Sequence, residues 1–114
     1  MATIYKICPT GLWQEALAAG AFTGSEVDRA DGYIHFSAAS QVAGTLARHY
    51  AGVAGLLLAA FDEAQLSPPI RYEAARGGEL FPHLYGTFDP KGALWVRPLT
   101  LDAAGRHALP ELLP

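Results

Sequence analysis

The chain has 114 residues, of which 51% are hydrophobic and 17% are charged, a balance that predicts one globular domain over residues 1–114 and excludes a disordered chain. Eight lysines and arginines against eleven aspartates and glutamates give a net charge of −3, and the basic residues are scattered singly. This distribution argues against a nucleic-acid polymer as partner, whereas a nucleotide or another small anion needs only two or three donors.

The first third of the chain predicts one strand, one helix and an irregular connection. Thr3–Cys8 is rich in β-forming residues and predicts a strand. Gly11–Ala19 has a helix-forming composition, with Thr10 placed to act as its N-cap. Ala21–Gly32 carries glycines, serine and aspartates and is expected to be a loop.

The next segment, Tyr33–Ser37, alternates strictly between apolar and polar side chains and predicts a second strand. A helix is expected from there to about Tyr50, capped by Ser37 or Ser40. Its polar face would carry Arg48, opposite an apolar stripe.

The second half of the chain is dominated by predicted strands, of which the first is apolar enough to be buried on both faces. These strands are Leu56–Phe61, Ile70–Ala74, Glu79–Gly86 and Ala93–Leu99. Pro82 favours an edge position for the third of them, since proline cannot donate to a ladder. A helical turn at Asp62–Leu66 and a last helix at Asp102–Leu113 complete an α+β pattern.

Location is predicted to be cytoplasmic. Cys8, the one cysteine, allows no disulfide within the chain, as in proteins of reducing compartments. Lys6 and Glu15 interrupt any signal-peptide pattern at the start. The longest nearly unbroken apolar stretch, Val53–Phe61, is far shorter than the roughly 20 residues that span a bilayer.

The segment from Asp31 to Ser37 (DGYIHFS) is the first candidate site. Alternation places the His35 imidazole and the Ser37 hydroxyl on one strand face, just before a predicted helix N-terminus that favours an anionic oxygen. His35 could then bind a ligand or transfer a proton. The structural alternative is a half-buried histidine next to an ordinary serine cap.

The second candidate site is the stretch from Arg71 to Tyr85, which is crowded with polar side chains and glycines. Its polar members are Arg71, Glu73, Arg76, Glu79, His83 and Tyr85. Arg71 and Glu73 share a strand face, so a weak surface ion pair would explain those two alone. The crowding of the others predicts a ligand-binding surface.

Several common site types are not expected from these residues. His35 and His83 stand in no HxH or HExxH spacing, so no metal site is predicted. The chain has no GxSxG elbow and no P-loop motif. Cys8 lies on an apolar strand, where a buried structural cysteine is commoner than a nucleophile.

Three motifs, IYKICP, DGYIHFSAASQV and RYEAARGGELFPHLYG, together resemble the bacterial family catalogued as domain of unknown function 952. This resemblance runs over nearly the whole chain. It implies no particular activity.

A more distant resemblance concerns IHFSAASQVAGTLARHYAG and the apolar strand that follows, which are similar to the central part of RNA 2'-phosphotransferases. It implies an ADP-ribosyltransferase-like fold, a split β-sheet that grips a nicotinamide dinucleotide. By this resemblance His35, Ser37 and Arg48 would line the cleft and Lys6 would stand near the nicotinamide ribose. Lys6-Ile7-Cys8 replaces the usual His-Gly-Thr, and no Glu-x-Glu pair is present.

Three function hypotheses remain open on the sequence. In the first, an NAD-dependent transferase uses His35 to orient the ribose or a phosphate and Glu79 or Glu73 to stabilise an oxocarbenium-like transition state. Asp31, Arg71, His83 and Tyr85 would join Lys6, Ser37 and Arg48 in binding the ligand. The second is a binding module for a small anion or a protein tail. The third, a two-histidine phosphoesterase, fits His35-Phe36-Ser37 but not His83-Leu84-Tyr85, which lacks the second small hydroxyl residue.

Overall fold

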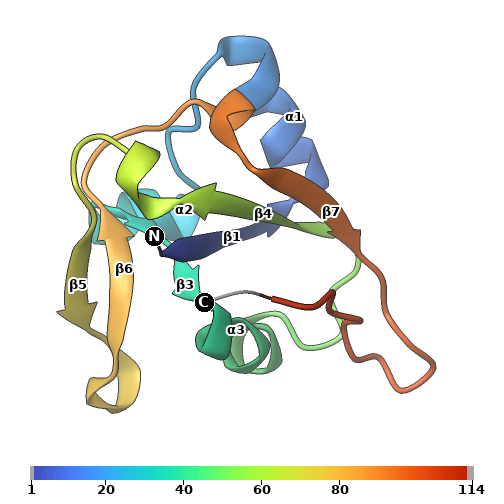
Figure 1. The fold of residues 1–114 in the computed structure, drawn as a ribbon. Coiled ribbons are helices and arrows are strands. Elements are labelled where there is room, and N and C mark those ends of the chain that lie inside the picture. The colour runs from blue at the N-terminus through green and yellow to red at the C-terminus, as the bar shows by residue number, and fades with distance from the viewer. Residues whose placement is uncertain (1, 113–114) are drawn as a thin grey trace.

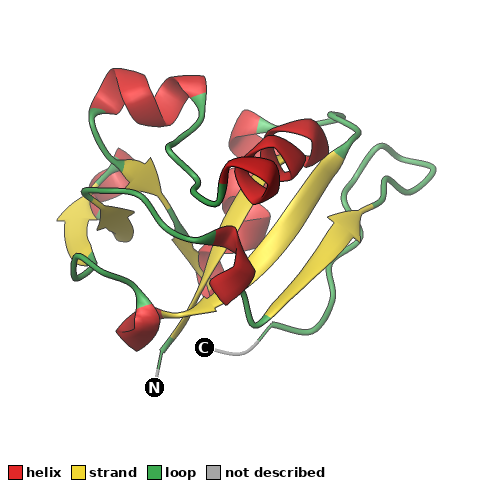
Figure 2. Ribbon diagram, turned by 90° about the horizontal axis from the view of Figure 1, so that it is seen from above, coloured by secondary structure: helices red, strands yellow, loops and turns green. Residues whose placement is uncertain are grey.

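The computed structural model describes residues 2–112, apart from the side chain of Arg76. It contains two antiparallel β-sheets and a few short helices, which confirms the α+β prediction (Figures 1 and 2). Within these residues, no helix combines the length and the apolar character needed to cross a membrane.

The larger sheet forms the centre of the molecule and has the strand order β3-β1-β4-β7. Its strands are β1 (Thr3–Pro9), β3 (Ser37–Ala38), β4 (Leu56–Asp62) and β7 (Trp95–Leu99). Every residue of β4 except the last is buried, as its unbroken apolar sequence predicts. One core lies on each side of this sheet because helices cover both faces: α1 (Thr10–Ala19) packs Trp13 on one face, and α3 (Val42–His49) packs Leu46 on the other (Figure 1).

The smaller sheet has the order β2-β6-β5 and stands beside the larger one (Figure 1). Its strands are β2 (Ile34–His35), β5 (Arg71–Ala74) and β6 (Leu80–Leu84). The edge position that Pro82 favours is wrong, because β6 is the middle strand. A proline is tolerated there because β2 pairs only with Leu84 and His83, so no backbone N–H is required of Pro82 on that side. The Pro82 carbonyl is still used, since it accepts from the Phe36 N–H.

The chain changes sheet at Phe36, so the expected single strand Tyr33–Ser37 is two short strands. His35 in β2 pairs with His83, whereas Ser37 in β3 pairs with Tyr5 of the larger sheet. Phe36 between them is only 2% exposed and packs in the core. The extended, alternating segment is present, but Phe36 carries it from the smaller sheet to the larger one, so its two halves pair in different sheets.

A helix is present where a loop was expected. α2 (Glu26–Asp31) begins with a capping box, in which the Asp28 N–H donates to the Ser25 hydroxyl and the Ser25 N–H donates to the Asp28 carboxylate. Gly32 ends the helix in a left-handed conformation (φ 87°), which suits glycine. The prediction of an irregular Ala21–Gly32 is therefore wrong in its second half.

The expected caps of the other helices also differ. Thr10 is already inside α1, and its hydroxyl donates to the Gly55 carbonyl. α3 follows a short 3₁₀ turn, Ala39–Gln41, where the Gln41 side chain accepts from the Ala38 N–H. Neither Ser37 nor Ser40 caps a helix, because the turn places a glutamine at the helix start.

The expected terminal helix Asp102–Leu113 is absent over residues 102–112, and Leu113 lies outside the described part. In its place Asp102 accepts from the Ala104 and Arg106 N–H groups, and Leu101 bridges to His107. The Asp102 carboxylate satisfies local donors that a helix would use, which favours a turn.

Candidate functional site

A pocket of about 510 Å³ opens between the two sheets, α2 and α3. Both sheets contribute to its lining, through Ser37 of the larger sheet and Phe81 of the smaller one. Seven of the residues that the sequence singled out line it: Lys6, Asp31, His35, Ser37, Arg48, Glu79 and His83. The two candidate segments therefore meet at one place, although Arg71, Glu73 and Tyr85 do not belong to the lining.

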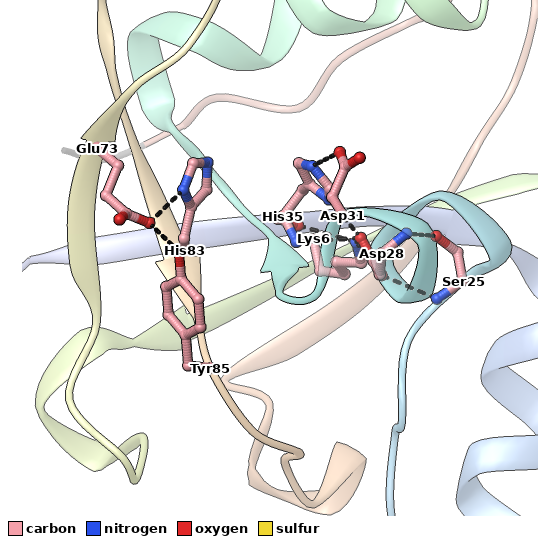
Figure 3. Close-up of polar contacts among 8 residues, drawn as sticks. All are labelled: Lys6, Ser25, Asp28, Asp31, His35, Glu73, His83 and Tyr85. Carbon is pink, nitrogen blue, oxygen red and sulfur yellow. Dashed lines mark hydrogen bonds and ion pairs between the residues drawn. The ribbon is translucent and has the colours of Figure 1, made fainter.

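Asp28 is the centre of the polar cluster on one side of the pocket (Figure 3). Its carboxylate accepts from the Lys6 ammonium at 3.1 and 3.3 Å, while Lys6 also donates to the His35 carbonyl at 2.8 Å. The His35 N–H and the Ser25 N–H donate to the same carboxylate. Lys6 and Asp28 are both buried, so this ion pair ties β1, α2 and β2 together away from water.

The ionised form of Asp28 is strongly favoured. Burial alone raises the pKa of Asp28, but the hydrogen bond from His35, the charge of Lys6 and two backbone N–H groups outweigh it and hold the pKa far below its usual value. Burial lowers the pKa of Lys6, and the attraction of Asp28 opposes that change. The three oxygens around the Lys6 ammonium accept from its three N–H groups, so Lys6 lines the pocket without a free hydrogen-bond donor.

His35 is held between two carboxylates. Its Nδ1 lies 2.6 Å from Asp28 Oδ1, and its Nε2 lies 2.9 Å from Asp31 Oδ2. A neutral imidazole has one N–H and satisfies one carboxylate, whereas the imidazolium donates to both. Both ring nitrogens are therefore engaged, although about a third of the side chain is exposed to solvent.

Glu73 organises the cluster on the other side (Figure 3). Its Oε1 lies 2.9 Å from His83 Nδ1 and accepts from the Tyr85 hydroxyl at 2.7 Å. Hydrogen bonds from His83 and Tyr85 lower the pKa of Glu73, with a smaller contribution from the charge of Arg71. Glu73 and Tyr85 thus act on the pocket through His83, which is buried and lines it.

Tyr33 joins the two clusters. Its ring stacks on His83 with centroids 4.0 Å apart and contacts the His35 ring at 4.7 Å. His35 and His83 are direct cross-strand partners, with ring centroids 5.6 Å apart. On the outer side, the Arg71 guanidinium lies over the Tyr85 ring at 4.8 Å, which leaves Arg71 outside the pocket.

One face of α3 and of the turn before it forms the wall between these clusters. Residues four apart on a helix share a face, and Ser40, Gly44 and Arg48 all line the pocket. Gln41 is buried and donates to the Leu80 carbonyl, which fixes this face against β6. Arg48 is exposed and makes no hydrogen bond or ion pair with the residues that the structure describes.

Two important pocket residues, Asp28 and Thr45, escaped the sequence analysis, whereas Tyr33 belonged to the candidate segment from Asp31 to Ser37 but was given no role. Asp28 had a detectable signal, because Lys6 lies among apolar residues of a predicted strand and needs a carboxylate partner where that strand is buried. Ser25-x-x-Asp28 also resembles a capping box, with aspartate in place of the usual glutamate or glutamine. Nothing in the sequence singles out Thr45, whose hydroxyl lies 3.3 Å from that of Ser37.

Among residues 2–112, no three histidine, cysteine or carboxylate side chains converge as metal ligands would. Cys8 is a free, buried cysteine, and burial raises the pKa of its thiol to about 11. A thiol with that pKa is a poor nucleophile at neutral pH.

Comparison with known proteins identifies relatives of the same size. The chain is similar to CC0527 of Caulobacter crescentus in its crystal structure (42% identity, 93% of each chain covered, TM-score 0.87) and in its solution NMR structure (42% identity, 93% and 91% covered, TM-score 0.83). A double mutant of CC0527 matches equally well in structure, at 40% identity and a TM-score of 0.87. No curated protein matches the chain. The family model described as "Protein of unknown function (DUF952)" matches residues 7–96, so this chain belongs to that family.

Proposed function

We propose that the chain binds a small phosphate-bearing ligand, such as a nucleotide or a dinucleotide, in the pocket between the two sheets. The observation that carries the proposal is Arg48. It is a permanent cation on the pocket wall without an ionic partner among the described residues. A guanidinium with free donors binds phosphate oxygens in two-point geometry, and Ser40 supplies a hydroxyl on the same pocket wall, about two helical turns away.

The rest of the pocket suits such a ligand. Its volume of about 510 Å³ is typical of small-molecule sites, which combine an apolar lining with a few polar groups. Phe81 provides an aromatic surface for a ring, and Ser37 and Thr45 provide hydroxyls on the α3 side. The other cation nearby, Lys6, is neutralised by Asp28, so Arg48 is the side chain on which phosphate binding would depend.

Calorimetry with ADP-ribose, NAD and inorganic phosphate tests this proposal. An Arg48→Gln variant should weaken ADP-ribose binding about tenfold or more, because a hydrogen bond to a charged group contributes about 1.5–3 kcal/mol. Arg97→Gln is the matched control, since Arg97 is exposed on β7 and lies outside the pocket lining. Absence of binding at millimolar concentrations, or equal affinity of the Arg48 variant, would exclude the proposal.

A second candidate, NAD-dependent transfer, is favoured by the presence of His35 and Glu79 in the same lining. The resemblance to the ADP-ribosyltransferase-like fold suggests this chemistry, and a pocket lined by two sheets supports it. The bond between nicotinamide and ribose would break with its electron pair leaving on nicotinamide, and an acceptor oxygen would take its place. Glu79 would stabilise the positive charge that develops on the ribose. Lys6 is less suited to hold the ribose, because its donors are used by Asp28 and His35.

Nicotinamide release from NAD distinguishes transfer from binding alone. For a transferase, Glu79→Gln should abolish release, while Glu63→Gln, a control outside the pocket lining, should leave it unchanged. A binding module would bind NAD without releasing nicotinamide, and Glu79→Gln would then alter affinity only. Binding without release would therefore exclude the transferase and leave the binding function in place.

A further inference from the structure

The two pocket histidines differ in which ring atoms remain available. At His35 both nitrogens face carboxylates, those of Asp28 and Asp31. At His83 only Nδ1 has a partner, the Glu73 carboxylate, and Nε2 makes no hydrogen bond to the residues that the structure describes. No unpartnered polar side-chain atom in the described part is sealed from solvent, so Nε2 of His83 keeps some accessible surface, although the side chain, which lines the pocket, is only 3% exposed.

The partner of Nδ1 determines which nitrogen carries the proton. A glutamate carboxylate is ionised at neutral pH, and the hydrogen bond from the Tyr85 hydroxyl stabilises that form, so the Glu73 carboxylate only accepts. The nitrogen facing it must then be the N–H. In neutral His83 the lone pair consequently lies on Nε2, the ring nitrogen without a partner among the described residues.

The ring is also held in place. Tyr33 stacks on it with centroids 4.0 Å apart, and the backbone of His83 is paired on one side with Arg71 and on the other with His35. The groups around His83 are thus Glu73, Tyr85 and Arg71 on its own sheet and Tyr33 and His35 across it. Of these, Glu73 alone contacts a ring nitrogen of His83.

We propose that Nε2 of His83, oriented by Glu73, is the proton acceptor of the pocket, and that the ligand carries a hydroxyl group near its phosphate. This inference rests on the proposed binding function and specifies its ligand as a hydroxyl-bearing phosphate, such as a ribose phosphate. The ligand hydroxyl donates to Nε2. In a full transfer the O–H bond breaks, an N–H bond forms at Nε2, and the electron pair stays on the ligand oxygen, which becomes a nucleophile. Glu73 is a positioning residue, because it acts through His83.

Nitrogen NMR of protein labelled with ¹⁵N-histidine tests the assignment without any ligand. The resonances of His83 are identified by their loss in a His83→Gln variant. At a pH where the ring is neutral, His83 should be protonated at Nδ1 and unprotonated at Nε2. A neutral ring protonated at Nε2 would overturn the proposal.

A glutamate variant separates positioning from mere packing. In Glu73→Ala the Nδ1 atom loses its acceptor, so a second population with the proton on Nε2 should appear. Glu63→Ala is the control, because Glu63 accepts from the Tyr72 hydroxyl and does not contact His83. An unchanged tautomer in the Glu73 variant would show that Glu73 does not orient the ring, and would overturn the proposal.

Titration with ADP-ribose then separates this inference from the binding function. Binding should move the Nε2 resonance of His83 and leave Nδ1 nearly unchanged, and a response confined to Nδ1 would overturn the inference while the binding function stands. Absence of any calorimetric binding would exclude the binding function. In that case the unliganded spectra still decide whether Nε2 is the open acceptor.

Discussion

The pocket has a histidine–carboxylate cluster on each side, and the two clusters use similar residues in different ways. In the Lys6–Asp28–His35 cluster a buried carboxylate is surrounded by donors from three elements, and each histidine nitrogen has a carboxylate partner. In the Glu73–His83–Tyr85 cluster the carboxylate is partly exposed and one histidine nitrogen is open. A saturated network maintains the fold, whereas an unsaturated one leaves an atom available for a ligand.

The difference follows from where each carboxylate lies. Asp28 is 3% exposed, so leaving any of its lone pairs or its charge unpaired would cost free energy. Glu73 has a side chain that is 38% exposed, so water can complete its solvation. Three predictions test whether one cluster is structural and the other is not.

The largest effect is expected from Asp28→Asn. This change leaves the Lys6 ammonium buried without its counter-charge, which should lower the free energy of unfolding by about 3–5 kcal/mol. Urea denaturation at neutral pH measures it. Adding Lys6→Met to the variant should recover part of the loss, because the unpaired charge is then removed. A loss below about 1 kcal/mol for Asp28→Asn would show that this ion pair is not a structural centre.

A smaller effect is expected from acid. The pKa of Asp28 is lower in the folded chain than in the unfolded one, so the unfolded chain binds the proton first. This contribution is complete above the ordinary aspartate pKa of about 3.9 and is lost as the pH falls through and below it. The loss from this one group approaches about 1.4 kcal/mol per pH unit. Urea denaturation should be measured at pH values of about 5, 4 and 3. The free energy of unfolding should fall less steeply with falling pH in the Lys6→Met/Asp28→Asn variant than in the wild type. Equal slopes would contradict the prediction.

The smallest effect on stability is expected from Glu73→Gln. Glutamine keeps an oxygen that can accept from Tyr85, and the side chain is partly exposed, so the urea midpoint should move much less than in Asp28→Asn. Tyr85→Phe provides the control for loss of the second hydrogen bond. A shift as large as that of Asp28→Asn would mean that both clusters are structural and would remove the distinction between them.

The predictions from sequence succeeded where burial alone decides structure. The unbroken apolar stretch of β4 is buried as expected, and β1 forms where β-forming residues predicted a strand. Val42 and Leu46 of α3 pack on the sheet, in agreement with the apolar stripe expected of that helix. The predictions from sequence failed where hydrogen bonds from nearby side chains decide the local structure. The Asp28 capping box makes a helix in a glycine-rich segment, and the Asp102 carboxylate makes a turn in place of a terminal helix.

The candidate site was predicted in part for the same reason. Alternation before a predicted helix drew attention to His35, and crowding of polar side chains drew attention to Glu79 and His83. All three line one pocket. Asp28 was overlooked, because its partner Lys6 is 22 positions away in the chain and no local pattern joins them. The relative importance of His35 and His83 could not be judged either, since it depends on which of their nitrogens meet a carboxylate.

By itself, the sequence determined an α+β chain with one strand buried on both faces, and it marked two polar segments that burial does not explain. Periodicity and composition act over a few neighbouring residues, so they are sufficient for such features. Only the tertiary structure decided that Phe36 carries the chain from one sheet to the other and that His35 and His83 become cross-strand partners. It also decided which carboxylates are saturated, because hydrogen-bond partners far apart in the chain are brought together by packing alone.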